Sequence, residues 1–413
     1  MFAAYALALV ILLIVFRRVG RLEVPIWAAM CIGAALVLLA GSISPQAALD
    51  SIDFPLILFL FGTFAIARAL EISGLLEDFA YRAFGRAENY NGLLLIILFG
   101  AGLLSAILMN DPFAVIGTPL IILMSRKMGT PPKPLLLALA FSITIGSALS
   151  PIGNPQNLFI ATKSGMASPF ITFAQYLLLP TLVNLAIAYF VLKLFYPGKA
   201  GGGKFALNTR ISMVRDARLA FIGKLSVALF ALLIAARIAA GIWGFESLLP
   251  LPAISLIGAL PILLFSRRRA EIARTLDWET LALFCAMFVL MQAVWNEGLF
   301  QSILASLSLD VKSIGVILLS SAVASQFISN VPFAALYLPL LSAAGAGAKE
   351  FIALAAGSTL AGNLTPLGAA SNLIILASAE KRGERITFFE FLKIGAVMTA
   401  LNLIVVYIFL SVL

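Results

Sequence analysis

The chain has 413 residues, of which 62% are hydrophobic and only 11% are charged. Because soluble globular proteins carry about 25% charged residues, this composition lacks the polar surface that a water-soluble body needs. The composition excludes cytosolic enzymes and DNA-binding proteins. The net charge of +9 is therefore interpreted from the positions of Lys and Arg relative to a membrane, and no nucleic-acid partner is predicted.

Twelve apolar runs follow one another along the chain, and together they predict an all-α polytopic membrane protein of the multi-pass type. The runs lie at residues 2–16, 24–42, 54–70, 92–126, 134–166, 172–195, 219–242, 249–266, 277–295, 313–345, 349–379 and 386–412.

Four of these runs are interrupted by proline and short polar residues near their midpoints. The runs at 92–126 and 313–345 carry Asn110-Asp111-Pro112 and Ser329-Asn330-Val331-Pro332. Since proline disrupts a helix interior, we predict two re-entrant hairpins there. The runs at 134–166 and 349–379 have polar motifs at 150–157 and 362–372 and are predicted to be spanning helices that unwind in the middle.

The two halves of the chain repeat one another. Asp53 matches Asp277 at an offset of 224, and the hairpin motifs match at 220. At an offset of 215 four residues match, Pro151, Gly153, Asn157 and Leu158 with Pro366, Gly368, Asn372 and Leu373. Each half therefore has five spanning helices, one of them broken, and one re-entrant hairpin. Because five is odd, the two repeats are predicted to have inverted topology.

The distribution of Lys and Arg predicts the orientation. With this crossing pattern, 20 of the 28 lie on one face, only Lys163, Lys312 and Lys349 lie on the other, and the remaining five lie within or at the ends of runs. By the positive-inside rule the first face is cytoplasmic and both termini lie outside. The predicted units are an inverted repeat over 1–196, a cytoplasmic linker over 197–218 and a second inverted repeat over 219–413, in the cytoplasmic (inner) membrane of the cell.

Polar residues gather at the four breaks and form the predicted substrate and ion site. Unwound backbone inside a membrane needs partners for its N–H and C=O groups, and a bound ion or solute can supply them. Uncharged oxygen and amide side chains suit Na+ or an oxyanion better than a transition metal. The candidate ligands are Asn110, Asp111, Ser150, Gly153, Asn154, Gln156, Asn157, Ser329, Asn330, Asn363, Thr365, Gly368, Ser371 and Asn372. The alternative for each single Asn or Ser is that it caps a half-helix.

Asp111 is the carboxylate placed deep within a run, whereas Asp53, Asp277, Glu279 and Glu390 lie at run ends. An ionisable residue inside the membrane indicates function, so we expect Asp111 to bind the coupling cation or to carry a proton. The chain has no His, so proton coupling depends on carboxylates, and no catalytic residue or organic cofactor is predicted.

Through Gly153-Asn154-Pro155-Gln156-Asn157, the motif at 362–372 and the two hairpins, the sequence resembles the ion transporter superfamily. That superfamily includes divalent-anion/sodium symporters, citrate carriers and arsenite pumps. The resemblance implies elevator-type alternating access, a homodimer in the lipid bilayer and Na+ near Asn110, Asp111, Gly153, Asn330 and Gly368. The dicarboxylate symporters carry Ser-Asn-Thr at both tips. The tips here are Met109-Asn110-Asp111 and Ser329-Asn330-Val331, and the first is more similar to the arsenite-pump branch.

The predicted function is secondary active transport of a small organic anion or inorganic oxyanion, coupled to Na+ or H+. Arsenite or antimonite efflux and Na+/H+ antiport stay open as alternatives. A channel is disfavoured, because the polar residues lie only at mid-membrane depth and do not line a continuous pore.

Overall fold

The computed structural model describes residues 2–16, 18–19, 22–107, 110–197, 213–243, 245, 249–298 and 310–412. Over these residues the fold is helical, apart from the two-residue strands β1 (Arg18–Val19) and β2 (Leu22–Glu23), which pair antiparallel. The predicted all-α polytopic fold is thereby confirmed.

Both halves are built from helices that correspond to the predicted runs, with short helices between them. The first half contains α1 (Phe2–Phe16), α2 (Ile26–Leu39), α3 (Pro45–Ser51), α4 (Phe54–Ser73), α5 (Leu75–Phe84), α6 (Tyr90–Leu95), the π-helix η1 (Ile96–Ala101), α7 (Gly102–Ser105), α8 (Asn110–Met128), α9 (Lys133–Ser147), α10 (Pro155–Lys163) and α11 (Pro169–Phe195). The second half contains α12 (Ala217–Ile242), α13 (Leu251–Phe265), α14 (Arg269–Arg274), α15 (Trp278–Asn296), α17 (Ile314–Ile328), α18 (Asn330–Ala343), α19 (Ala348–Leu360), the 3-10 turns η3 (Ala361–Asn363) and η4 (Pro366–Gly368), α20 (Ala370–Glu380) and α21 (Phe388–Val412).

Five helices, α4, α11, α12, α15 and α21, are long and apolar enough to cross a membrane. Three predicted continuous spans are short: α1, α2 and α13 have 15, 14 and 15 residues, and α2 and α13 are also shorter than their apolar runs. At about 1.5 Å per residue each covers roughly 21–23 Å, less than the hydrocarbon thickness of about 30 Å. Pro25 and Pro250 set the first residues of α2 and α13, and Gly41, with φ of 70°, follows the end of α2.

The interruptions lie where the sequence predicted them. The first hairpin changes direction between α7 and α8, whose first turn contains Pro112. In the second hairpin a single residue, Ser329, separates α17 from α18 and has φ of 71°. The broken helices α9–α10 and α19–α20 have unwound segments at 148–154 and 361–369, the latter with two 3-10 turns.

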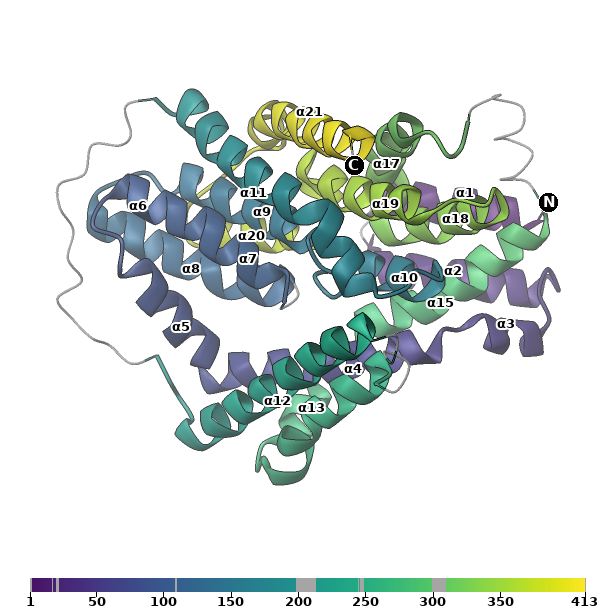
Figure 1. Cartoon of the computed structure of the whole chain (residues 1–413), viewed down its shortest axis with the longest axis horizontal. Coiled ribbons are helices and arrows are strands. Elements are labelled where there is room, and N and C mark those ends of the chain that lie inside the picture. Colours follow the sequence, from purple (N-terminus) through teal and green to yellow (C-terminus); the bar gives the residue numbers. More distant parts are fainter. Residues whose placement is uncertain are drawn as a thin grey trace.

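The helix contacts define two groups, and Figure 1 shows α4, α12 and α13 of the first group at the bottom of the view, below α8, α9 and α11 of the second. In the first group α4 packs against α12 and α13, and α2 packs against α1 and α15. In the second group α9 lies against both arms of the first hairpin, α19 against both arms of the second, and α11 against α21. We call the first group the scaffold and the second the core domain.

The contacts are reciprocal between the halves. Half-helix α10 packs against α18 of the second hairpin, and α20 packs against α8 of the first. Each broken helix thus holds the hairpin of the other half. The inverted orientation of the repeats, and the domain boundaries based on it, stay predictions.

The described end of the predicted linker is fixed to α5. Met213 donates its N–H to Asp78 Oδ1 at 3.1 Å, and Arg215 forms an ion pair with Glu77 at 2.6 Å. α12 begins at Ala217, inside the predicted linker of 197–218. Residues 198–212, with the glycine run of that linker, lie outside the described residues.

Candidate substrate and ion site

A cavity of about 480 Å³ lies where the two hairpin tips and the two broken helices meet. The core domain contributes the first residues of α8, α10, α18 and α20 to its wall. The scaffold contributes the first turns of α2 and α15 together with Phe64 of α4. The cavity therefore lies between the scaffold and the core domain.

Eight of the fourteen predicted ligands line this cavity. They come from all four interrupted segments, as the repeat analysis predicted: Asn110, Asp111, Asn154, Gln156, Ser329, Asn330, Gly368 and Ser371. Ser150, Gly153, Asn157, Asn363, Thr365 and Asn372 lie outside the lining, and the role of all fourteen as ligands stays a prediction.

Asn157 and Asn372 make equivalent contacts at the same repeat offset of 215. Asn157 donates its amide to Ser147 O at 3.1 Å, and Asn372 donates its amide to Gly362 O at 2.8 Å. Both side chains are fully buried. Each therefore satisfies a carbonyl freed by the break in its own helix, which helps to make unwound backbone tolerable at this depth.

Asn154 connects the two broken helices. Its Oδ1 accepts the N–H of Asn157 at 2.9 Å and so caps α10, while its Nδ2 donates to Thr359 Oγ1 at 3.0 Å. Gln156 Nε2 is 3.5 Å from the same hydroxyl. Asn154 therefore caps a half-helix and also lines the cavity.

Three of the predicted residues outside the cavity lining, Thr365, Asn363 and Ser150, make hydrogen bonds in the unwound segments. Thr365 donates to Gln326 Oε1 at 2.8 Å, and the Gln326 amide donates to Ala361 O at 2.8 Å. Asn363 Nδ2 lies 3.5 Å from Asn402 Oδ1, and Ser150 Oγ accepts the N–H of Ile152 at 3.2 Å. These contacts fix the shape of the unwound segments.

Gly153 and Gly368 are required by close backbone approach. A Cβ at Gly153 would overlap Ser147 O, and one at Gly368 would lie 2.9 Å from Gly362 O. Both glycines let the returning chain pass directly over the end of the preceding half-helix.

The two hairpin tips present partly unsatisfied amides. Asn110 Nδ2 lies 3.4 Å from Ser147 Oγ. Within the described part of the chain, the Oδ1 atoms of Asn110 and Asn330 and the Oγ atom of Ser371 are buried and have no hydrogen-bond partner. A buried acceptor without a partner costs about 1–3 kcal/mol, so a bound cation or hydroxyl-bearing solute would be stabilised there.

The cavity is acidic. Asp111 of the core domain shares it with Asp277 and Glu279 at the start of α15, and no Lys or Arg occurs among the described residues that line it. Two arginines of the scaffold helices lie outside the lining: Arg68 pairs with Glu71 at 2.6 Å, and Arg237 donates to Leu249 O. Asp53 and Asp277 cap α4 and α15, which confirms their placement at run ends.

Several lining residues were missed by sequence reasoning. Thr144 and Thr359 both line the cavity and are separated by the repeat offset of 215, so the repeat itself carried a signal for them. Trp27, Phe64 and Phe284 are aromatic residues on the scaffold side of the wall, for which no polar motif gave a signal.

A helical fold with interrupted helices around a cavity between two bodies defines a polytopic membrane transporter. The chain belongs to the citrate transporter family, whose model matches residues 11–361.

An uncharacterized transporter of Mycobacterium tuberculosis is 27% identical over 422 residues, covering 96% of this chain and 95% of the relative. The silicon efflux transporter LSI3 of Oryza sativa subsp. japonica is 33% identical over 192 residues, covering 46% of this chain and 39% of that one. The P protein of Mus musculus is 25% identical over 95% of this chain and 58% of its own length.

The crystal structure of the Alcanivorax borkumensis YdaH transporter has the same fold. It matches with a TM-score of 0.62 at 14% sequence identity and covers 99% of this chain and 97% of that one.

Proposed function

We propose that this protein is a secondary active transporter that moves a small anion, organic or an inorganic oxyanion, together with Na+ or H+. The acidic cavity is the observation that carries the proposal. Its walls offer amides, hydroxyls and three carboxylates, and no cationic side chain among the described residues. Two like charges 4–8 Å apart repel by roughly 2–4 kcal/mol at an effective dielectric constant of 20, so an anion enters this cavity favourably only with a cation.

Asp111 is the proposed coupling residue. It lies at the first hairpin tip beside Asn110, on the body that also holds the broken helices. A cation or proton on Asp111 neutralises the carboxylate that the core domain contributes to the cavity. Cargo binding and cation binding then favour one another, which is what coupled transport requires.

The proposed movement is of the elevator type. The cavity lies between the scaffold and the core domain, so displacement of one against the other would carry it towards the opposite face. We expect the protein to act as a homodimer in the cytoplasmic membrane, with both termini outside.

A second candidate is efflux of a neutral hydroxylated solute such as arsenious acid. An acidic wall with amide and hydroxyl groups accepts a neutral polyhydroxylated molecule without a compensating cation. The similarity to a rice silicon efflux transporter, over about half of this chain, also favours this candidate.

The deciding experiment is flux into proteoliposomes under imposed Na+ and H+ gradients, with carboxylates, oxyanions and arsenite or silicic acid as cargo. Gradient-driven uptake of an anion supports the first proposal. Flux of the neutral acids alone would replace it by the second. Na+/H+ exchange without any cargo would make the protein an antiporter and contradict both.

A further inference from the structure

Lys163 and Asp53 join the core domain to the scaffold by an ion pair. Lys163 lies in the last turn of α10, and its Nζ is 3.1 Å from Asp53 Oδ2. Asp53 also caps α4, since its Oδ1 accepts the N–H of Leu56 at 3.1 Å. The Asp53 side chain is 5% exposed and that of Lys163 is 47% exposed, so the pair lies at the rim of the protein.

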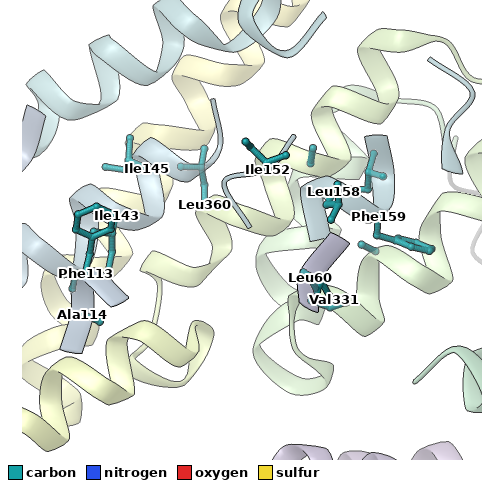
Figure 2. Close-up of a cluster of buried hydrophobic side chains, with 14 of the residues drawn as sticks. Leu60, Phe113, Ala114, Ile143, Ile145, Ile152, Leu158, Phe159, Val331 and Leu360 are labelled. Carbon is teal, nitrogen blue, oxygen red and sulfur yellow. The ribbon is translucent and has the colours of Figure 1, made fainter. Parts of the chain in front are cut away.

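An apolar layer separates this ion pair from the cavity. Along α10, Gln156 lines the cavity, Phe159 packs against Phe288 of α15 with ring centroids 5.6 Å apart, and Lys163 follows one turn later. Along α4 the order is reversed: Asp53 comes first, then the fully buried Leu60, then Phe64 at the cavity. Leu60, Leu158, Phe159 and Val331 belong to the buried cluster drawn in Figure 2.

The repeat partner of Asp53 is in the opposite situation. Asp277 caps α15 as Asp53 caps α4, with Thr280 N donating to Asp277 Oδ1 at 3.0 Å. However, Asp277 lines the cavity, and the position that matches Lys163 at the offset of 215 is Ser378. The cavity is therefore bordered by Asp277 at one end, and is separated from Asp53 by packed aromatic and aliphatic side chains at the other.

We propose that the Asp53–Lys163 ion pair is a latch that holds one face of the transporter closed. In this state the core domain is docked against the end of α4 that carries Asp53. The cavity lies instead beside the end of α15 that carries Asp277. Opening the latched face separates Phe159 from Phe288 and Lys163 from Asp53. When the pair separates, the mostly buried Asp53 carboxylate loses its cationic partner, which costs free energy. The ion pair therefore favours the state with this face closed.

The latch is tested by the reactivity of a buried reporter, without any cargo. In a background with Cys31→Ala and Cys285→Ala, Leu60→Cys reacts with a membrane-impermeant maleimide, added to the latched face, only when that face opens. Lys163→Gln should raise the labelling rate roughly threefold to tenfold, the range expected for a pair with one buried partner.

Asp53→Asn separates the charge of Asp53 from its capping role, because Asn also accepts the N–H of Leu56. It should accelerate labelling as much as Lys163→Gln, and the double variant should match either single one. Lys163→Arg should keep the slow rate.

Lys133→Gln is the matched control. Lys133 and Glu390 form an ion pair of the same 3.1 Å length, but they join α9 to α21 within the core domain. Removing that pair should leave the labelling of Leu60→Cys unchanged.

Salt gives a second measurement that needs no change to the pair. Raising the ionic strength should accelerate labelling in the parent and leave the Lys163→Gln variant unaffected. Parental labelling rates in both Asp53→Asn and Lys163→Gln, with unchanged melting temperatures, would overturn the latch. The transporter class and the coupling proposal would be untouched by that result.

Discussion

Thr359 donates its hydroxyl to Asn157 Oδ1 at 3.0 Å, although the two residues are 202 positions apart. The same hydroxyl accepts the amide of Asn154 at 3.0 Å. One side chain at the end of α19 therefore stabilises the break in the other broken helix. The two halves of the site are held together by direct hydrogen bonds as well as by packing.

Thr359→Val should destabilise the protein. The change keeps the shape of the side chain but leaves the amide of Asn154 and Oδ1 of Asn157 without this partner, which costs about 1–3 kcal/mol. A lower melting temperature in detergent is the expected readout, and Thr359→Ser should restore most of the loss. Thr162→Val is the control, because among the described residues Thr162 Oγ1 bonds only to carbonyls of its own helix, at Leu158 and Phe159. Equal losses at positions 162 and 359 would contradict the bridging role.

The breaks in the helices were predictable from sequence because they depend on local chemistry. Pro112, Pro155 and Pro332 each lie in the first turn of a helix, where a missing N–H is tolerated, and Pro112 and Pro332 match at the repeat offset of 220. The prediction gathered the right four segments into one site for the same reason.

The division of the polar residues within that site was not predictable. Asn154 lines the cavity and Asn157 satisfies a carbonyl behind it, yet both are Asn three positions apart in one motif. Which of them faces the cavity depends on how the unwound segment turns. Composition and spacing do not specify that turn.

The acidity of the site was underestimated for a different reason. Asp277 and Asp53 are equivalent in sequence, and both cap the third helix of their repeat. Their surroundings differ: Asp277 lines the cavity, whereas Asp53 pairs with Lys163, and the position that matches Lys163 is Ser378. Which carboxylate lines the cavity depends on how the helices pack, and the spacing of the repeats does not specify that packing.

Asp111→Asn should uncouple transport. The substitution keeps the size of the side chain and removes its charge. A contact to a charged group contributes about 1.5–3 kcal/mol, so the free energy of cation binding should weaken by this amount. We expect an apparent cation affinity about 10- to 100-fold weaker, measured as the Na+ or H+ dependence of uptake in proteoliposomes. Asp50→Asn is the control, since Asp50 is exposed and bonds only to Gln46 among the described residues. Full coupling in Asp111→Asn would refute the role of this carboxylate.

Gly146→Ala should prevent normal packing of the first hairpin. A Cβ at Gly146 would overlap Gly102 O, so α9 could no longer lie against α7. A clash with backbone has no side-chain rotamer to relieve it, and overpacking of this kind costs about 1–3 kcal/mol or more. Yield, melting temperature and transport should all fall. Gly100→Ala should be tolerated, because its nearest neighbour is Ile96 Cγ2 at 3.8 Å. Similar behaviour of the two variants would show that the close approach of α7 and α9 is unimportant.

Single cysteines at two exposed lysines test the predicted orientation of the repeats. Lys127 follows the first hairpin and Lys312 precedes the second, and both side chains are exposed. If the halves are inverted and the basic face is cytoplasmic, Lys127→Cys should react with an impermeant maleimide only after the cells are opened. Lys312→Cys should react in intact cells, at least about tenfold faster than Lys127→Cys. Labelling of both from the same side would mean that the hairpins enter the membrane from one face, and the inverted arrangement with its positive-inside assignment would be wrong.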